Sequence, residues 1–141
     1  MPKSAPINIR LSSDLEKRIN ALARRTGRSR NALLESLIDE AERERRYPGL
    51  RFRGTDSTRR PYIIGTGMDV WEIVRALQDF ADDAARLANE TKLATQDIGL
   101  ALAYYREFPE EIDQALAMDR RPLEELQRDY PFIETLLIDD A

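Results

Sequence analysis

The residue types that carry out most enzymatic chemistry are missing from this sequence. It contains neither cysteine nor histidine, which removes disulfides, thiolate nucleophiles, zinc fingers and histidine-based catalytic triads. The carboxylates that remain stand largely in adjacent pairs, and neighbours on a helix point apart. These pairs are Asp82-Asp83, Glu110-Glu111, Glu124-Glu125 and Asp139-Asp140. They are typical of solvated faces and helix starts, so the sequence indicates no enzyme, no metal site and no cofactor.

A different chemistry, the recognition of nucleic-acid bases, is indicated near the N-terminus. Residues Ile7–Ser12 read INIRLS, the alternating pattern of a strand with one buried face. Asn8, Arg10 and Ser12 then share the opposite face. Arginine binds guanine bidentately and asparagine binds adenine in the major groove, so we predict that these three side chains read bases. An ordinary edge strand shows the same alternation.

This strand has no partner nearby, because helical patterns follow it for more than thirty residues. Unpaired backbone N–H and C=O groups are unfavourable when they are buried. Antiparallel pairing with the same segment of a second copy would satisfy them and would turn Ile7, Ile9 and Leu11 onto the helices. We therefore expect a homodimer or a higher even oligomer whose outward ribbon fits the major groove of double-stranded DNA.

Two helices with clear start and stop signals follow the strand. Ser12 or Ser13 caps the first helix, which ends at Gly27. Ser29 caps the second helix, which Tyr47-Pro48-Gly49 ends. The apolar stripes are Leu15, Ile19, Leu22 and Ala23 on the first helix, and Leu34, Leu37, Ile38 and Ala41 on the second.

The charges divide the chain into a basic head and an acidic body. Residues 1–46 hold eleven Lys and Arg against seven Asp and Glu, whereas residues 47–141 hold eleven against nineteen. This asymmetry indicates nucleic acid at one end and another kind of partner at the other. The arginines of the head, Arg24, Arg25, Arg28 and Arg30, are equally compatible with a solvated basic face.

The segment INIRLSSDLEKRINALARRTGRSRNALLESLIDEAER resembles the ribbon-helix-helix repressors, a CopG- and Arc-like family, over residues 6–46. The resemblance implies a dimeric DNA-binding domain, which we place at residues 1–46. In that family the start of the second helix faces the phosphate backbone. Carried over to this chain, the resemblance assigns phosphate contacts to Arg28, Ser29 and Arg30.

The remainder of the chain predicts a hairpin followed by helices, so the expected fold is mainly α. Two short strand patterns flank a turn within residues 50–66, and helical patterns run from Met68 onward. We expect a hairpin and helix-turn-helix-like bundle at residues 47–121 and a helical tail at residues 122–141. Gly65-Thr66-Gly67 is interpreted as a turn, since it lacks the residues of a phosphate-binding loop.

The block RRPYIIGTGMDVWEIVRAL, together with IGLALAYYREFPEEID, resembles the small bacterial domain of unknown function 433. Gly67 departs from that family, which often has an arginine there, and an acidic stretch replaces its usual short turn. The resemblance implies an antitoxin that accompanies a toxin of the PIN-like nuclease class. The apolar tail residues Phe132, Ile133, Leu136 and Leu137 either cover the chain's own core or bind that partner.

The sequence as a whole predicts a cytoplasmic antitoxin of a type II toxin-antitoxin pair, which represses its own operon by binding operator DNA. It carries no apolar run of about eighteen residues and no secretion signal, so we expect no membrane association. The alternative is a stand-alone ribbon-helix-helix regulator whose second domain binds a ligand or drives oligomerisation.

Overall fold

The computed structural model describes residues 4–119 and residue 128, and these form two compact units. The first unit consists of the described residues up to Pro48 together with Gly54–Arg59. The second consists of Gly49–Arg53 and the described residues from Arg60 onward. The apolar tail residues that are expected either to cover the chain's own core or to bind a partner lie outside the described residues; they are Phe132, Ile133, Leu136 and Leu137.

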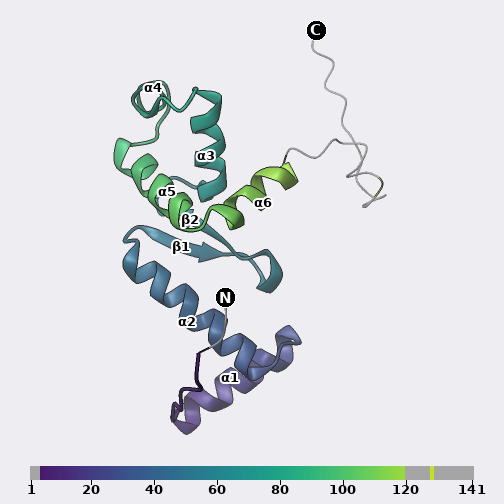
Figure 1. Cartoon of the computed structure of the whole chain (residues 1–141). Coiled ribbons are helices and arrows are strands. Elements are labelled where there is room, and N and C mark those ends of the chain that lie inside the picture. The colour runs from purple at the N-terminus through teal and green to yellow at the C-terminus, as the bar shows by residue number, and fades with distance from the viewer. Residues whose placement is uncertain (1–3, 120–127, 129–141) are drawn as a thin grey trace. The chain divides into compact units, whose positions relative to one another are not determined.

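The first unit contains helices α1, Ser13–Thr26, and α2, Arg30–Arg46, which pack against each other (Figure 1). Ser12 caps α1 by accepting a hydrogen bond from the Leu15 N–H at 3.3 Å. Gly27 ends α1 in the left-handed conformation, with φ at 68°, which glycine adopts without strain. Both helix ends therefore follow the sequence signals, and of the two candidate serines Ser12 is the cap.

The core of the first unit is small. Ile19, Ala23 and Leu33 are buried, and a few leucines pack partly buried around them, namely Leu15, Leu22 and Leu34. The rest of the α2 stripe is on the surface of the single chain: Leu37, Ile38 and Ala41 are all exposed. An apolar stripe that one chain leaves uncovered is a feature of chains that bury it against a partner.

The second unit begins with a two-stranded antiparallel sheet, in which β1, Leu50–Arg53, pairs with β2, Arg60–Ile63. Leu50 lies opposite Ile63, and both are almost completely buried. The predicted hairpin is therefore confirmed. The loop Gly54–Arg59 between the strands contains a short 3-10 turn, η1, Asp56–Thr58, and belongs to the first unit.

After the sheet, residues 64–119 of the second unit contain four helices: α3, Val70–Asp79, α4, Ala84–Glu90, α5, Thr95–Glu107, and α6, Pro109–Asp119. Helix α3 packs against α5 and α6 (Figure 1). Its buried face is the predicted one, Val70, Ile73, Val74 and Leu77. The mainly α architecture expected from the sequence is thus confirmed, and among the described residues no helix is long and apolar enough to span a membrane.

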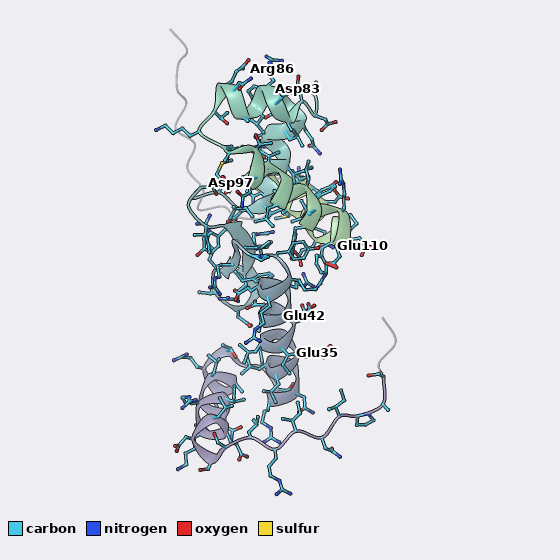
Figure 2. All side chains as sticks on the ribbon, turned by 90° about the vertical axis from the view of Figure 1, so that its left-hand side faces the viewer. Glu35, Glu42, Asp83, Arg86, Asp97 and Glu110 are labelled. Atoms are coloured by element: carbon cyan, nitrogen blue, oxygen red, sulfur yellow. The ribbon has the colours of Figure 1, made fainter. Side chains whose placement is uncertain are left out.

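Three local expectations from the sequence patterns are wrong in the second unit: a helix that continues through residues 81–91, Thr95 as the cap of α5, and Tyr105 on the buried face of α5. The helical pattern after Phe80 does not continue, because Ala81 and Asp82 have left-handed φ angles of 55° and 61° and separate α3 from α4. Asp83 then caps α4 by accepting a hydrogen bond from the Arg86 N–H, at the helix start seen in Figure 2. Helix α5 is preceded by Ala94 as its N-cap, without a side-chain hydrogen bond, so Thr95 is not the cap.

The third difference concerns which tyrosine of α5 reaches the core. The expected face ends at Tyr105, but the buried residues are Ile98, Ala101 and Tyr104. Tyr104 is fully buried, and its hydroxyl donates to Glu111 Oε2 at 2.6 Å. A stacking role for Tyr104 on nucleic-acid bases is therefore excluded in this conformation.

Candidate nucleic-acid interface

The N-terminal segment Ile7–Leu11 is extended and lacks a partner within the described part of the chain. No residue there forms a backbone hydrogen bond with it, and Figure 2 shows the segment running away from α1. Ile7 is 80% exposed and Ile9 is 64% exposed. Alternating isoleucines in water beside unpaired backbone groups form a strand edge that is ready to pair with another chain.

The three predicted base-reading residues are all on the surface. Asn8 and Arg10 are exposed, and they alternate with the exposed isoleucines along the same segment. Ser12 is also exposed, but its hydroxyl oxygen already accepts the hydrogen bond that caps α1. A serine hydroxyl can accept one hydrogen bond and still donate another, so this capping role leaves its proton available.

The start of α2 has the geometry of an anion site. Ser29 is the N-cap, and its hydroxyl accepts from the Ala32 N–H at 3.1 Å. The first N–H groups of any α-helix lack partners inside the helix, and the helix dipole makes this end positive. The first turn of α2 contains no acidic residue that would oppose an anion.

Arg28 lies just before this cap, but its side chain runs along α2 instead of extending beyond the helix start. One guanidinium nitrogen, Nη1, donates to Asp56 Oδ1 at 3.1 Å. The other, Nη2, donates to Ser36 Oγ at 2.9 Å, in the second turn of the helix. Sequence reasoning missed Asp56, because no local pattern links residues that are 28 positions apart.

Arg30 also has an acidic neighbour. Its Nη1 lies 3.4 Å from Glu16 Oε1, and roughly half of each side chain is exposed. An exposed pair at this distance is weak, so Arg30 can exchange Glu16 for another anion at little cost. Ser29 and Arg30 thus lie at the start of α2, whereas the Arg28 guanidinium lies along the helix, and both arginines have intramolecular carboxylate partners.

The Gly65-Thr66-Gly67 segment of the second unit forms a turn. Thr66 Oγ1 donates to the Ile63 carbonyl at 2.8 Å and accepts from the Met68 N–H at 3.0 Å. Gly65 and Gly67 have φ angles of 86° and 69°, which disfavour other residues. The predicted turn into a helix is confirmed, and the threonine oxygen is occupied by the turn itself.

A shallow hollow of about 280 Å³ lies beside this turn in the second unit. Its lining combines polar residues, including Thr66, Lys92 and Asp97, with apolar ones such as Met68 and Leu93. Within the ranges that the structure describes, no group of three acidic residues is arranged to hold a metal ion.

Residues 5–45 match the family described as ribbon-helix-helix protein, copG family. The match covers less than a third of the 141-residue chain and coincides with the extended segment, α1 and α2. No curated protein and no solved structure shows significant similarity to the chain.

The N-terminal part of the chain is therefore a ribbon-helix-helix domain. Proteins of this family are DNA-binding regulators and are typically dimeric. The match and the exposed, unpaired segment together indicate a DNA-binding transcriptional regulator. The likeness of the second unit to the domain of unknown function 433 lies outside the matched residues.

Proposed function

We propose that this chain is the antitoxin of a type II toxin-antitoxin pair, which binds operator DNA as a dimer and represses its own operon. The DNA-binding half of this proposal is supported by the conformation and exposure of residues Ile7–Leu11 in the single chain. They are extended, their isoleucines are exposed, and no described residue pairs with their backbone. Pairing with a second copy would satisfy the backbone and cover the isoleucines in one step.

In such a dimer each side chain has a distinct task. Asn8, Arg10 and Ser12 project from the outer face of the ribbon and contact base edges in the major groove. The N-terminal turn of α2, with Ser29 as its cap, receives a DNA phosphate, and Arg28 and Arg30 add positive charge. Base contacts set the sequence preference, and phosphate contacts fix the orientation of the domain on the duplex.

Fluorescence anisotropy with a labelled duplex from the region upstream of the chain's own reading frame tests the DNA-binding half. We expect the dimer to bind this duplex more tightly than a scrambled one. Arg28→Ala should weaken binding to both duplexes alike and reduce the salt slope by about one unit. Equal affinity for the two duplexes would contradict operator recognition.

The second half of the proposal is neutralisation of a toxin, of the PIN-like nuclease class, by the C-terminal part of the chain. It is supported by the acidic balance of residues 47–141 and by the likeness to domain of unknown function 433. Co-expression with the product of the neighbouring reading frame tests it. We expect growth rescue and co-purification, and failure of both would remove the antitoxin role.

The hollow beside Thr66 favours a second candidate, a stand-alone regulator whose second unit binds a small ligand. Its mixed polar and apolar lining is typical of small-molecule sites. DNA binding that is unaffected by the neighbouring gene product but changes with a small molecule would favour this candidate over the antitoxin.

A further inference from the structure

The loop Gly54–Arg59 is fixed to one face of α2 by two ion pairs. Arg28 Nη1 donates to Asp56 Oδ1 at 3.1 Å, and Arg59 Nε donates to Glu40 Oε1 at 2.7 Å. Arg28 precedes the helix, but its Nη2 reaches Ser36 Oγ, and Ser36 and Glu40 are four positions apart, so the two pairs hold the loop along one face of α2. The Glu40 carboxylate raises the pKa of Arg59, chiefly by this hydrogen bond.

The loop has a defined internal structure. The Thr58 N–H donates to the Thr55 carbonyl at 2.7 Å, and Arg59 Nη1 donates to the Gly54 carbonyl at 3.0 Å. Gly54 has a φ of 107°, and a Cβ at this position would lie 2.6 Å from the Thr58 carbonyl oxygen. Asp56 is therefore presented to Arg28 by a compact turn.

The Asp56 carboxylate is the anion that Arg28 binds in the single chain. Arg28 is also the residue to which we assign a contact with a DNA phosphate. With Nη1 on Asp56 and Nη2 on Ser36, the guanidinium lies along α2. A phosphate at the helix start attracts the same positive charge, and Arg28 has to leave Asp56 to reach it. The side chains of this pair are 30% and 35% exposed, so the exchange is accessible at modest cost.

We propose that Asp56 is an intramolecular competitor of DNA for Arg28, so that the loop Gly54–Arg59 gates the phosphate site of the ribbon-helix-helix domain. This inference rests on the proposed function, because that function places a phosphate at Arg28. The gate lowers affinity for every duplex equally, since a phosphate contact carries no sequence information. Because the gate weakens the phosphate contact, a larger share of the free energy of operator binding comes from base contacts.

The variant Asp56→Asn tests the gate in the full-length chain, because it keeps the shape of the side chain and removes its charge. We expect about two- to fivefold tighter binding of operator and scrambled duplexes alike, the range that an exposed ion pair supports. The salt slope should change little, because Arg28 contacts a phosphate in the bound complex of both chains and only the competing carboxylate is removed.

Two controls separate the gate from a general change of charge. Glu42→Gln makes the same charge change on α2, where Figure 2 labels Glu42. This residue pairs with Arg46, and its substitution should alter affinity less than Asp56→Asn. In an Arg28→Ala background, Asp56→Asn should have no more effect than Glu42→Gln. Equal effects of Asp56→Asn with and without Arg28 would overturn the gate, as would weaker binding by Asp56→Asn alone.

Titration with inorganic phosphate, followed by NMR of the α2 amides, tests without DNA whether Asp56 competes with an anion for Arg28. We expect phosphate to shift the first amides of α2 at lower concentration in Asp56→Asn than in the wild type. If this difference is seen but no duplex binds, the proposed function fails and the gate stands. If duplexes bind but Asp56→Asn equals the wild type in both assays, the gate fails and the function stands.

Discussion

Arg53 and Asp69 join the sheet of the second unit to the start of its first helix. Arg53 Nε donates to Asp69 Oδ1 at 2.9 Å, and Arg53 Nη2 lies 2.7 Å from the same oxygen. Asp69 also accepts from Trp71 Nε1 at 3.2 Å and forms a capping box with Glu72 at the start of α3. One carboxylate thus organises the segment that carries the Gly-Thr and Val-Trp motif, and it gives Trp71 a half-buried structural role.

Replacing this carboxylate should destabilise the second unit. Asp69→Ala removes the cap of α3 and the acceptor of Trp71 Nε1, and it leaves Arg53 with only the Gly67 carbonyl of these two partners, so we expect a loss of about 1–2 kcal/mol in the free energy of unfolding. Denaturant unfolding followed by tryptophan fluorescence measures it. Glu90→Ala, which removes only the exposed pair with Arg86, should stay within about 0.5 kcal/mol of the wild type.

The exposed stripe of α2 predicts that dimerisation depends on Ile38. Ile38 is 55% exposed in the single chain and would be covered by a second copy. Ile38→Asp should therefore shift the chain toward monomer in sedimentation velocity, because a charge buried at the interface is unfavourable. The matched control is Ile64→Asp, at a residue that is 50% exposed in the second unit. Equal effects of the two substitutions would argue against a specific role of the α2 stripe.

Arg10 should determine the base preference at one position of each half-site. Arg10→Ala is expected to cost roughly 1–3 kcal/mol of operator binding and to flatten the preference at one base pair. Binding to a library of single-base operator variants measures both effects. Arg28→Ala is the comparison, since a phosphate contact should weaken all variants in parallel. An Arg10→Ala chain with unchanged affinity and preference would remove the ribbon from base recognition.

Tyr105 gives the second unit a component of stability that is lost at alkaline pH. Its hydroxyl donates to Asp113, and this hydrogen bond, with burial, raises the pKa of Tyr105 above its ordinary value of 10.0. The phenol is therefore protonated more readily in the folded chain than in the unfolded one. The resulting stabilisation is complete below the unfolded pKa and disappears as pH rises through the folded pKa.

Ultraviolet titration of the tyrosines checks this assignment. Asp113→Asn should lower the pKa of Tyr105 toward its ordinary value, and Tyr105→Phe should remove from the absorbance change a component that titrates above the ordinary tyrosine pKa. Unfolding experiments above about pH 9 should show a shallower alkaline loss of stability in Tyr105→Phe than in the wild type. Superimposable pH profiles for the two chains would show that the Tyr105 hydrogen bond contributes nothing.

Local signals predicted the first unit well because its helix ends depend on neighbouring residues. Ser29 caps α2 through its own N2–N3 turn, and Gly27 ends α1 through its own φ angle, so both are visible in the sequence. The break at Ala81 and Asp82 is different. Neither residue is glycine or proline, and the turn is held by hydrogen bonds back to Gln78 and Leu77, which no short-range pattern reveals.

The features of the candidate site likewise fall into those that local sequence patterns reveal and those that depend on tertiary contacts. The alternation of Ile7–Ser12 and the basic start of α2 can be read from the sequence alone, and their contacts with DNA stay a prediction. The attachment of Asp56 to Arg28 depends on how the loop between β1 and β2 lies along α2, a tertiary relationship. The choice between Tyr104 and Tyr105 for the core of α5 likewise depends on packing, because adjacent residues on a helix face different directions.

Pairing of two copies of Ile7–Leu11 is tested most directly by a disulfide between the two copies of residue 9. The wild-type chain has no cysteine, so Ile9→Cys introduces a single reactive position. If the two copies of Ile7–Leu11 pair antiparallel over their full length, residue 9 faces its counterpart at about 4.5–5.5 Å between Cα atoms, within disulfide range. We predict a covalent dimer on mild oxidation at low concentration, and none for Glu90→Cys on α4. Equal, low cross-linking of both variants, with a monomer in sedimentation, would contradict the intermolecular ribbon.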